Sequence, residues 1–274
     1  MKPVAFDYVR ADSLETALDA LAEYGDDAQL LAGGLSLMPM LNMRLARPGV
    51  VVDISRLSGN IIQHTGRIEV DLGVTQSALL KASRQRAFAP LLAAALPWVG
   101  HEQTRARGTV CGSVAHADPS AEIPLCLAML DGRGHLRSRA QARVVPFANF
   151  VHGLLTIDCH ADELIESVSF AVPAIGDGFA FKEFGRRHGD FAIVACAARV
   201  NGDVITLGIG GVADVPVVHQ LKLADVNSID EQLNTIAWGL GARSDVHADA
   251  RLRRHLTRML GRAVIDEAQA QCQS

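Results

Sequence analysis

At the start of the chain, segments whose apolar residues have the spacing of a helix are followed by segments typical of a strand. Residues 14–21 place leucines and alanines three or four positions apart, directly after the potential helix cap Ser13, and Gly25 ends the pattern. Mostly apolar runs, each interrupted by a single polar residue, predict short buried strands at 28–32 and 50–54. These spacings predict a first unit of mixed helices and strands, ending near residue 55.

A second unit begins near Arg56 and continues the same mixture. Alternating or apolar segments predict strands at 67–72, 133–138, 142–145 and 164–170. Helices are predicted at 75–83, at 88–96 and from Asp118 to Leu130. The stretch 100–113 is punctuated by glycines, and we expect a loop there.

A segment rich in proline and glycine, 173–178, is the expected domain boundary. Beyond it, apolar segments predict three strands, at 179–184, 192–200 and 204–212, of which the last two are joined by an Asn-Gly turn. The remainder predicts helices at about 229–241 and 247–260, with a third left open. We therefore expect an α+β chain with domains at 1–175, in lobes of about 1–55 and 56–175, and at 178–274.

Composition narrows the class of protein. Of the 274 residues, 49% are hydrophobic and 20% charged, which excludes a disordered or collagen-like chain. The net charge is -4, and there is no basic tail and little aromatic content, so we expect no nucleic-acid partner. The N-terminus lacks a signal-peptide core, and the apolar run 87–100 is broken by Pro90 and Pro97. We expect a cytoplasmic protein without a transmembrane segment.

Five cysteines stand far apart in the sequence. This spacing argues against a disulfide framework, and against a zinc ribbon or an iron–sulfur cluster within this chain, because those sites need clustered thiolates. The histidines show no metal-binding spacing, and no serine nucleophile elbow is present. We therefore expect no metal site and name no catalytic residue.

Two glycine-containing turns are the main candidates for a binding site. In the first, a predicted strand runs into Gly33-Gly34, and a predicted helix leaves from Ser36. Such a turn brings backbone N–H groups and a helix N-terminus close to an anion, which is how proteins bind a pyrophosphate. An ordinary tight turn is the alternative. The candidate residues are Ala32, Gly33, Gly34, Leu35, Ser36 and Leu37.

The second turn combines small residues, hydroxyl groups and a predicted helix start. Its residues are Thr109, Val110, Cys111, Gly112 and Ser113, and His116 and Asp118 follow shortly after. Two turns of this kind in one domain could hold a dinucleotide from both sides. Cys111 could act as a thiol nucleophile, but no partner histidine can be assigned to it, so a small buried residue is the preferred interpretation.

Two other motifs are weaker candidates. Gly208 to Ala213 fits the pattern G-x-G-x-x-A, but no helix follows it, so we interpret it as a close-packed or bulged strand rather than a nucleotide site. The polar stretch 182–191 could supply a His188–Asp190 pair for catalysis, and a charged turn between strands is the alternative.

Taken together, these segments resemble the FAD-binding medium subunit of the molybdenum hydroxylases, the group that includes xanthine dehydrogenase and carbon monoxide dehydrogenase. The resemblance covers nearly the whole chain. It is carried by 6–8, 31–48 (LAGGLSLMPMLNMRLARP), 100–101, 105–122 (RARGTVCGSVAHADPSAE), 162–164, Lys182 and 187–191.

The resemblance implies a two-lobed FAD-binding domain of the vanillyl-alcohol-oxidase type, followed by a three-stranded antiparallel sheet with a small helix bundle. It implies that 32–36 hold the FAD pyrophosphate and that 109–113 hold pyrophosphate and ribityl near the flavin ring. His116, Asp118 and Glu122 would lie near the adenosine half, Leu164 and Lys182 near the cofactor, and Phe191 beside the isoalloxazine ring.

Three residues depart from the usual family pattern. Leu35 stands where a polar residue is usual, Cys111 replaces a glycine, and Phe191 replaces a frequent tyrosine. A side chain at 111 predicts a negative φ there or a shifted loop.

The function implied is that of an oxidoreductase subunit. Substrate would be hydroxylated at a molybdopterin site in a large partner subunit, and electrons would cross the 2Fe-2S clusters of a small partner to this FAD and then to an external acceptor. The assembly would be a heterotrimer, arranged as a dimer of heterotrimers. Alternatives are a stand-alone flavin oxidoreductase, with His188 as its acid–base group, and an assembly module that has lost its flavin.

Overall fold

The computed structural model describes residues 2–86, 88–174, 176–223 and 226–272. The first unit is a small parallel sheet of order β1-β3-β2. Its elements are β1 (Asp7–Arg10), α1 (Leu14–Tyr24), a 3-10 turn (Gly25–Asp27), β2 (Ala28–Leu31), α2 (Leu37–Met43) and β3 (Val50–Asp53). The predicted helix after Ser13 is confirmed, because the Ser13 side chain accepts a hydrogen bond from the Thr16 N–H at 3.1 Å.

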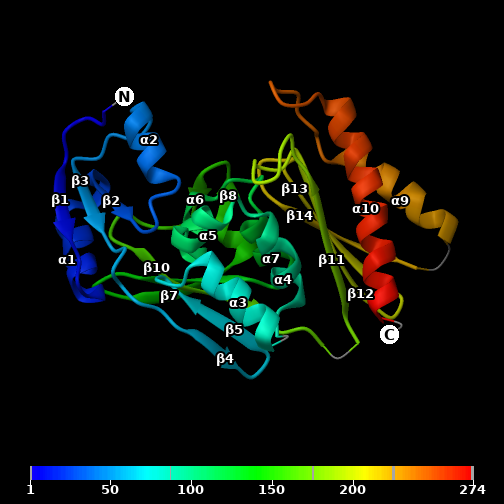
Figure 1. Ribbon diagram of the computed structural model, residues 1–274, viewed down its shortest axis with the longest axis horizontal. Coiled ribbons are helices and arrows are strands. Elements are labelled where there is room, and N and C mark those ends of the chain that lie inside the picture. Colours follow the sequence, from blue (N-terminus) through cyan, green and yellow to red (C-terminus); the bar gives the residue numbers. More distant parts are fainter. Residues whose placement is uncertain (1, 87, 175, 224–225, 273–274) are drawn as a thin grey trace.

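The second unit is an antiparallel sheet of order β4-β5-β10-β6-β7 with helices on one face (Figure 1). Its strands are β4 (Ile61–His64), β5 (Arg67–Asp71), β6 (Arg133–Arg137), β7 (Ala142–Pro146) and β10 (Leu164–Ala171). Its helices are α3 (Gln76–Arg86), α4 (Pro90–Ala95), α5 (Glu102–Arg107), α6 (Val110–His116), α7 (Glu122–Met129) and α8 (Phe147–Phe150). A 3-10 turn (Leu96–Trp98) and the small pair β8 (Val151–Gly153) and β9 (Thr156–Ile157) complete it.

The third unit is an antiparallel sheet of order β11-β12-β13-β14, which we call the C-terminal sheet. Its strands are β11 (Gly178–Phe184), β12 (Val194–Asn201), β13 (Val204–Gly210) and β14 (Val217–Lys222). Two helices, α9 (Val226–Gly239) and α10 (Ala250–Cys272), cover the face that points away from the rest of the chain (Figure 1).

The prediction of three strands was wrong, because the segment after Gly211 adds a fourth. Pro216 stands just before β14 and therefore removes no hydrogen bond from the ladder, and β14 is an edge strand. The predicted loop at 100–113 was also wrong, since α5 and α6 lie there with Gly108 between them. The last helix continues past Gly261, where a Cβ would lie 3.0 Å from the Leu233 side chain. That glycine permits close helix packing instead of ending the helix.

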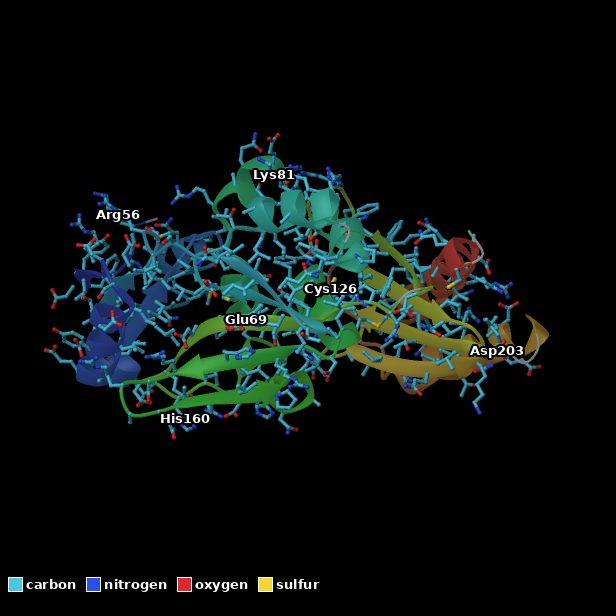
Figure 2. The ribbon with its side chains drawn as sticks, turned by 90° about the horizontal axis from the view of Figure 1, so that it is seen from below. Arg56, Glu69, Lys81, Cys126, His160 and Asp203 are labelled. Carbon is cyan, nitrogen blue, oxygen red and sulfur yellow. The ribbon has the colours of Figure 1, made fainter. Side chains whose placement is uncertain are left out.

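One hydrophobic core extends from the first sheet to the inner face of the C-terminal sheet. The buried members on that face include Phe179, Phe181 and Ala195, which join the core around α4 and α7. Figure 2 shows Cys126, on α7, in the interior of this region, while Lys81, His160 and Asp203 lie at the surface. A separate core lies between the C-terminal sheet and α9 and α10.

Glycines on β13 allow this sheet to approach α7 closely. A Cβ on Gly208 would lie 2.6 Å from the Met129 side chain, and Gly211 adopts a φ of +80° while its N–H donates to the Pro119 carbonyl at 2.8 Å. The interpretation of 208–213 as a close-packed strand is therefore confirmed. These contacts connect the C-terminal sheet to the loop that precedes α7.

Candidate functional site

The first glycine turn presents free backbone donors. It leaves β2 at Ala32 and enters α2, and Gly34 has a φ of +76°, a conformation that favours glycine. Within the described residues, no group accepts a hydrogen bond from the backbone N–H of Leu35, Ser36 or Leu37. Successive unpaired N–H groups form a concave site for an anion. This turn therefore has the donors that a phosphate group requires.

The second glycine turn is built differently, because its donors are mostly used within the protein. The Val110 N–H donates to the Val74 carbonyl at 3.0 Å, and the Gln76 N–H donates to the Gly108 carbonyl at 2.8 Å. Thr109 caps α6 by accepting a hydrogen bond from the Gly112 N–H at 3.0 Å. The turn is thus fixed against the segment that opens α3.

The structure brings the two turns into direct contact. A Cβ on Gly33 would lie 2.2 Å from the Arg107 carbonyl oxygen and 2.9 Å from the Gly108 Cα. The methyl group of Ala32 lies within van der Waals distance of a Cβ built on Gly112. The two turns therefore adjoin, and only glycine fits at position 33. That both turns bind one ligand stays a prediction.

Cys111 occupies the interior side of the second turn. It lies within α6, its side chain is buried, and its Sγ donates to the Val70 carbonyl at 3.5 Å. Its φ is negative, as predicted for a side chain at this position. Burial raises the pKa of the thiol far above its usual range. Cys111 is therefore an inert packing residue, as the preferred interpretation held.

The polar residues after the second turn lie at the end of α6 and the start of α7. His116 and Asp118 are half-buried, and Asp118 accepts a hydrogen bond from the Ser120 N–H at 2.8 Å. Glu122 is only 4% exposed, and burial raises its pKa to about 7. Its protonation state therefore changes near neutral pH.

Two predicted residues belong to strands rather than to the glycine turns. Leu164 opens β10 and is buried in the main core. The Lys182 ammonium group is 2.7 Å from Glu267 on α10, so it points to the face of the C-terminal sheet that is opposite to α4 and α7. A role for either residue near a cofactor stays a prediction, and for Lys182 the observed direction of the side chain argues against it.

The loop 185–191 lies against the segment 98–101. A Cβ on Gly189, whose φ is +87°, would lie 2.9 Å from the His101 ring, and the rings of Trp98 and His188 have centroids 5.8 Å apart. His188 therefore packs, with its ring tilted, against Trp98 and His101, and it has no carboxylate partner among the described residues. Phe191, on the same loop, is 56% exposed, which leaves its ring free to cover a ligand.

Arg105 holds the segment on which this loop rests. Its guanidinium group donates to the carbonyl oxygens of Pro97, Val99 and Gly100 at 3.3, 2.9 and 3.1 Å. Neither this role nor that of Gln76 has a separate signal in the sequence. The buried Oε1 of Gln76 has no hydrogen-bond partner in the described part of the chain and lies beside Gly108.

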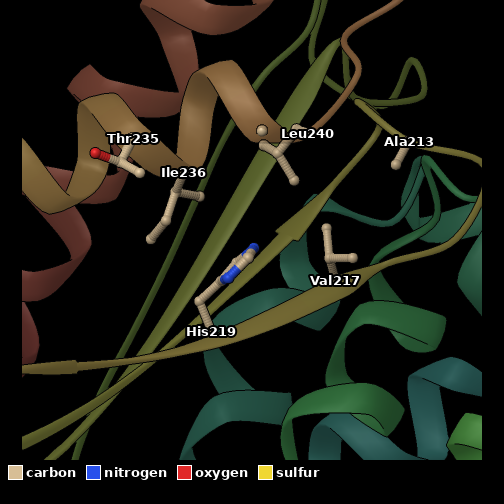
Figure 3. A pocket seen from close by; sticks show the side chains of 7 residues that line it. Ala213, Val217, His219, Thr235, Ile236 and Leu240 are labelled. Carbon is tan, nitrogen blue, oxygen red and sulfur yellow. The ribbon is translucent and has the colours of Figure 1, made fainter.

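A separate open cavity of about 400 Å³ lies between β14 and α9 (Figure 3). The His219 ring points into it and is surrounded by apolar side chains such as Val217, Ile236 and Leu240. It is lined by none of the glycine-turn residues and is not part of this site.

No helix within the described ranges has the length and apolar character needed to cross a bilayer. Over the same ranges, no three side chains of His, Cys, Asp or Glu converge as metal ligands would.

A family model described as the FAD binding domain in molybdopterin dehydrogenase matches residues 4–174. The chain belongs to this family. Its membership confirms the resemblance that the glycine turns indicated, and it makes the chain an FAD-binding oxidoreductase subunit. The matched range contains both turns and ends where β10 leads toward the C-terminal sheet.

Relatives of this family share most of the chain. It is 41% identical over 205 residues to the 6-hydroxypseudooxynicotine dehydrogenase complex subunit alpha of Paenarthrobacter nicotinovorans, covering 74% of this chain and 69% of that protein. It is 34% identical over 236 residues to the caffeine dehydrogenase subunit beta of a Pseudomonas strain, covering 81% and 78%. The fold matches carbon monoxide dehydrogenase from Oligotropha carboxidovorans with a TM-score of 0.93 at 26% identity, covering 99% of this chain and 100% of that chain.

The residues present fit FAD. The unpaired N–H groups at 35–37 suit a diphosphate, and the glycine contact at position 33 holds the second turn beside them. Leu35 offers an apolar, partly exposed side chain here, so the backbone rather than a side chain provides the donor at this position.

Proposed function

We propose that this chain is the FAD-binding, electron-transferring medium subunit of a heterotrimeric molybdenum hydroxylase. The N-terminal region would be a two-lobed domain of the vanillyl-alcohol-oxidase type. A large subunit would carry molybdopterin and hydroxylate the substrate, and a small subunit would carry two 2Fe-2S clusters. The complex would be a cytoplasmic dimer of heterotrimers. Bound FAD supplies the redox chemistry, accepting electrons from the clusters and passing them to an external acceptor.

The observation that carries this proposal is the contact between the two glycine turns beside a row of unpaired N–H groups. The N–H groups at 35–37 would bind the pyrophosphate, and Thr109 to Ser113 would position the adjoining ribityl chain. His116, Asp118 and Glu122 would lie toward the adenosine half. The ring of Phe191 would cover the isoalloxazine, because its loop is held against 98–101.

The decisive experiment is to express the chain with and without its proposed partner subunits and to record the visible absorption spectrum. We expect flavin bands, FAD release on denaturation, and co-purification with molybdenum and iron–sulfur subunits. Turnover of a substrate by the chain alone would favour a stand-alone flavin oxidoreductase. A colourless complex that cannot be reconstituted with FAD would overturn the proposal.

A further inference from the structure

Two carboxyl groups, one buried and one half-buried, lie where α7 packs against the C-terminal sheet. Glu122 is the first residue of α7 and is 4% exposed. Glu183 lies near the end of β11, and its Oε2 is buried without a hydrogen-bond partner in the described part of the chain. The helix α4 packs against both α7 and β11, which brings the segments of Glu122 and Glu183 together. The charge of Glu122 also acts on Glu183. The two carboxyl groups are therefore treated as a pair, although their segments are far apart in sequence.

The alternation of side chains along β11 fixes the direction of Glu183. Phe179 and Phe181 point into the main core, with α4 and α7, whereas Lys182 points to Glu267 on α10. Since successive side chains of a strand point to opposite faces, Glu183 shares the face of the two phenylalanines. A glutamate on an apolar face without a partner is costly unless it is protonated.

The surroundings supply little positive charge. The helix α4 contains only Pro, Leu and Ala, and the cross-strand neighbour of Glu183 is Ala195. Asp118 and Arg105 are the charged groups beside Glu122, but the Arg105 guanidinium group is bound to three carbonyl oxygens. Burial is the main cause that raises the pKa of Glu122 to about 7 and of Glu183 to about 8, and the Glu122 charge adds to the second shift.

The pair adjoins two segments of the candidate flavin site. Glu122 follows α6, which starts at the second glycine turn, after the short connection 117–121. Glu183 directly precedes Phe184 and the loop 185–191, which rests on His101 and carries Phe191. We therefore expect a charge at the proposed cofactor site to act on the pair in part through protein interior, where it is screened less than in bulk water.

We propose that Glu122 and Glu183 together bind an exchangeable proton whose uptake compensates the charge added when FAD is reduced. This inference rests on the proposed function. Two electrons come from the iron–sulfur clusters of the partner, and when FAD takes up only one proton from solvent, the cofactor gains one negative charge. One carboxylate of the pair then takes a second proton from solvent, forming an O–H bond. When the acceptor removes the electrons, both protons return to solvent.

The reciprocal effect follows from linkage. If reduction of the cofactor increases the proton affinity of the pair, protonation of the pair must increase the electron affinity of the cofactor by the same factor. Lowering the pH therefore raises the redox potential of the flavin by more than protonation of the flavin alone would.

The first test uses the full chain without FAD and measures infrared absorption. We expect the carbonyl band of a buried, protonated carboxyl group at about pH 6, which disappears as the pH rises to about 9. Glu183→Gln should remove part of this band, and Glu122→Gln should shift the remaining titration to lower pH, because the neighbouring charge is lost. Glu231→Gln, an exposed glutamate on α9, is the control and should change nothing. A band that is absent, or that Glu183→Gln leaves intact, would overturn the proposal.

The second test uses the chain loaded with FAD and counts the protons taken up on electrochemical reduction, with a pH indicator in weak buffer. At about pH 7.5, Glu183→Gln should take up fewer protons per flavin than the wild type, and Glu231→Gln the same number. A merely structural role would not alter this stoichiometry. Equal uptake in all three proteins would refute coupling. Failure to bind FAD would instead refute the proposed function, while the infrared result would still establish the proton-binding pair.

Discussion

The carbonyl group of Arg107 fills the space that a side chain on Gly33 would need. The distance from that oxygen to a Cβ built on Gly33 is 2.2 Å, and the atoms opposite are backbone atoms, which cannot rotate away. The two glycine turns are therefore complementary in shape, and the site exists only while both hold this position.

Replacing Gly33 by alanine should force the two turns apart. We expect a loss of about 1–3 kcal/mol in the free energy of unfolding, as for other overpacked sites, and a strong loss of bound FAD. The flavin-to-protein ratio and urea denaturation measure these effects. Gly239→Ala is the matched control, because a Cβ there meets nothing within 4 Å. Stoichiometric flavin in Gly33→Ala, or in the larger and charged Gly33→Asp, would contradict the assigned site.

Arg253 should be among the most sensitive residues of the C-terminal unit. It is 3% exposed and donates to the carbonyl oxygens of Ile193 and Gly211 at 2.6 and 2.7 Å, and to Asp245 at 2.6 Å. Arg253→Met leaves these acceptors unpaired, so we expect a loss of about 3 kcal/mol or more on thermal or urea unfolding. Arg251→Met, on the exposed face of the same helix, should cost less than about 0.5 kcal/mol. Similar stabilities for the two variants would show that the buried contacts do not matter.

Stability should fall as pH rises through neutrality, in part because of Glu122. Its folded-state pKa of about 7 lies above the ordinary value of 4.5, so its protonated form favours folding. This contribution is complete below about pH 4.5 and is lost as the pH rises through about 7. Relative to Glu122→Gln, the wild type should lose on the order of 2 kcal/mol between about pH 5 and pH 8. Parallel pH profiles from urea titrations of the flavin-free chains would rule out this assignment.

Phe191 should influence the spectrum of the bound flavin. Its exposed ring lies on the loop held by the Gly189–His101 contact, and we expect it to cover the isoalloxazine. Phe191→Ala should shift the flavin absorption bands or the redox potential, whereas Phe191→Tyr keeps the ring and should shift them less. Identical spectra and potentials in all three proteins would place Phe191 outside the site.

The sequence predicted the elements whose signals are local. Ser13 and Gly25 delimit α1 in the sequence as they do in the structure, and the β-branched run at 50–53 forms β3. The errors arose where tertiary packing decides. Gly261 has the appearance of a helix end, but it lies inside α10 because the side chain of Leu233 packs close to it.

The candidate site was predicted by composition and resemblance, but its geometry was not. Nothing in the sequence indicates that Gly33 meets Arg107, since this contact joins segments that are far apart in the chain. The inward direction of Glu183 is visible in the sequence, because every second residue of β11 (Phe179, Phe181 and Glu183) lies on the same face. The polar stretch that begins at Lys182 makes this alternation hard to recognise.

The hydrogen bonds of Arg253 also determine which parts of the structure can form before translation ends. Ile193 and Gly211 flank the base of the loop that rests on His101, and both are held by a residue that emerges from the ribosome long after the two glycine turns. The two glycine turns can therefore form while translation continues, but the backbone at Ile193 and Gly211 receives these hydrogen bonds only once α10 has been made. If the turns bind FAD as proposed, a nascent chain at that stage would have an interval for loading the cofactor before the last helix fixes the segment that follows the loop 185–191.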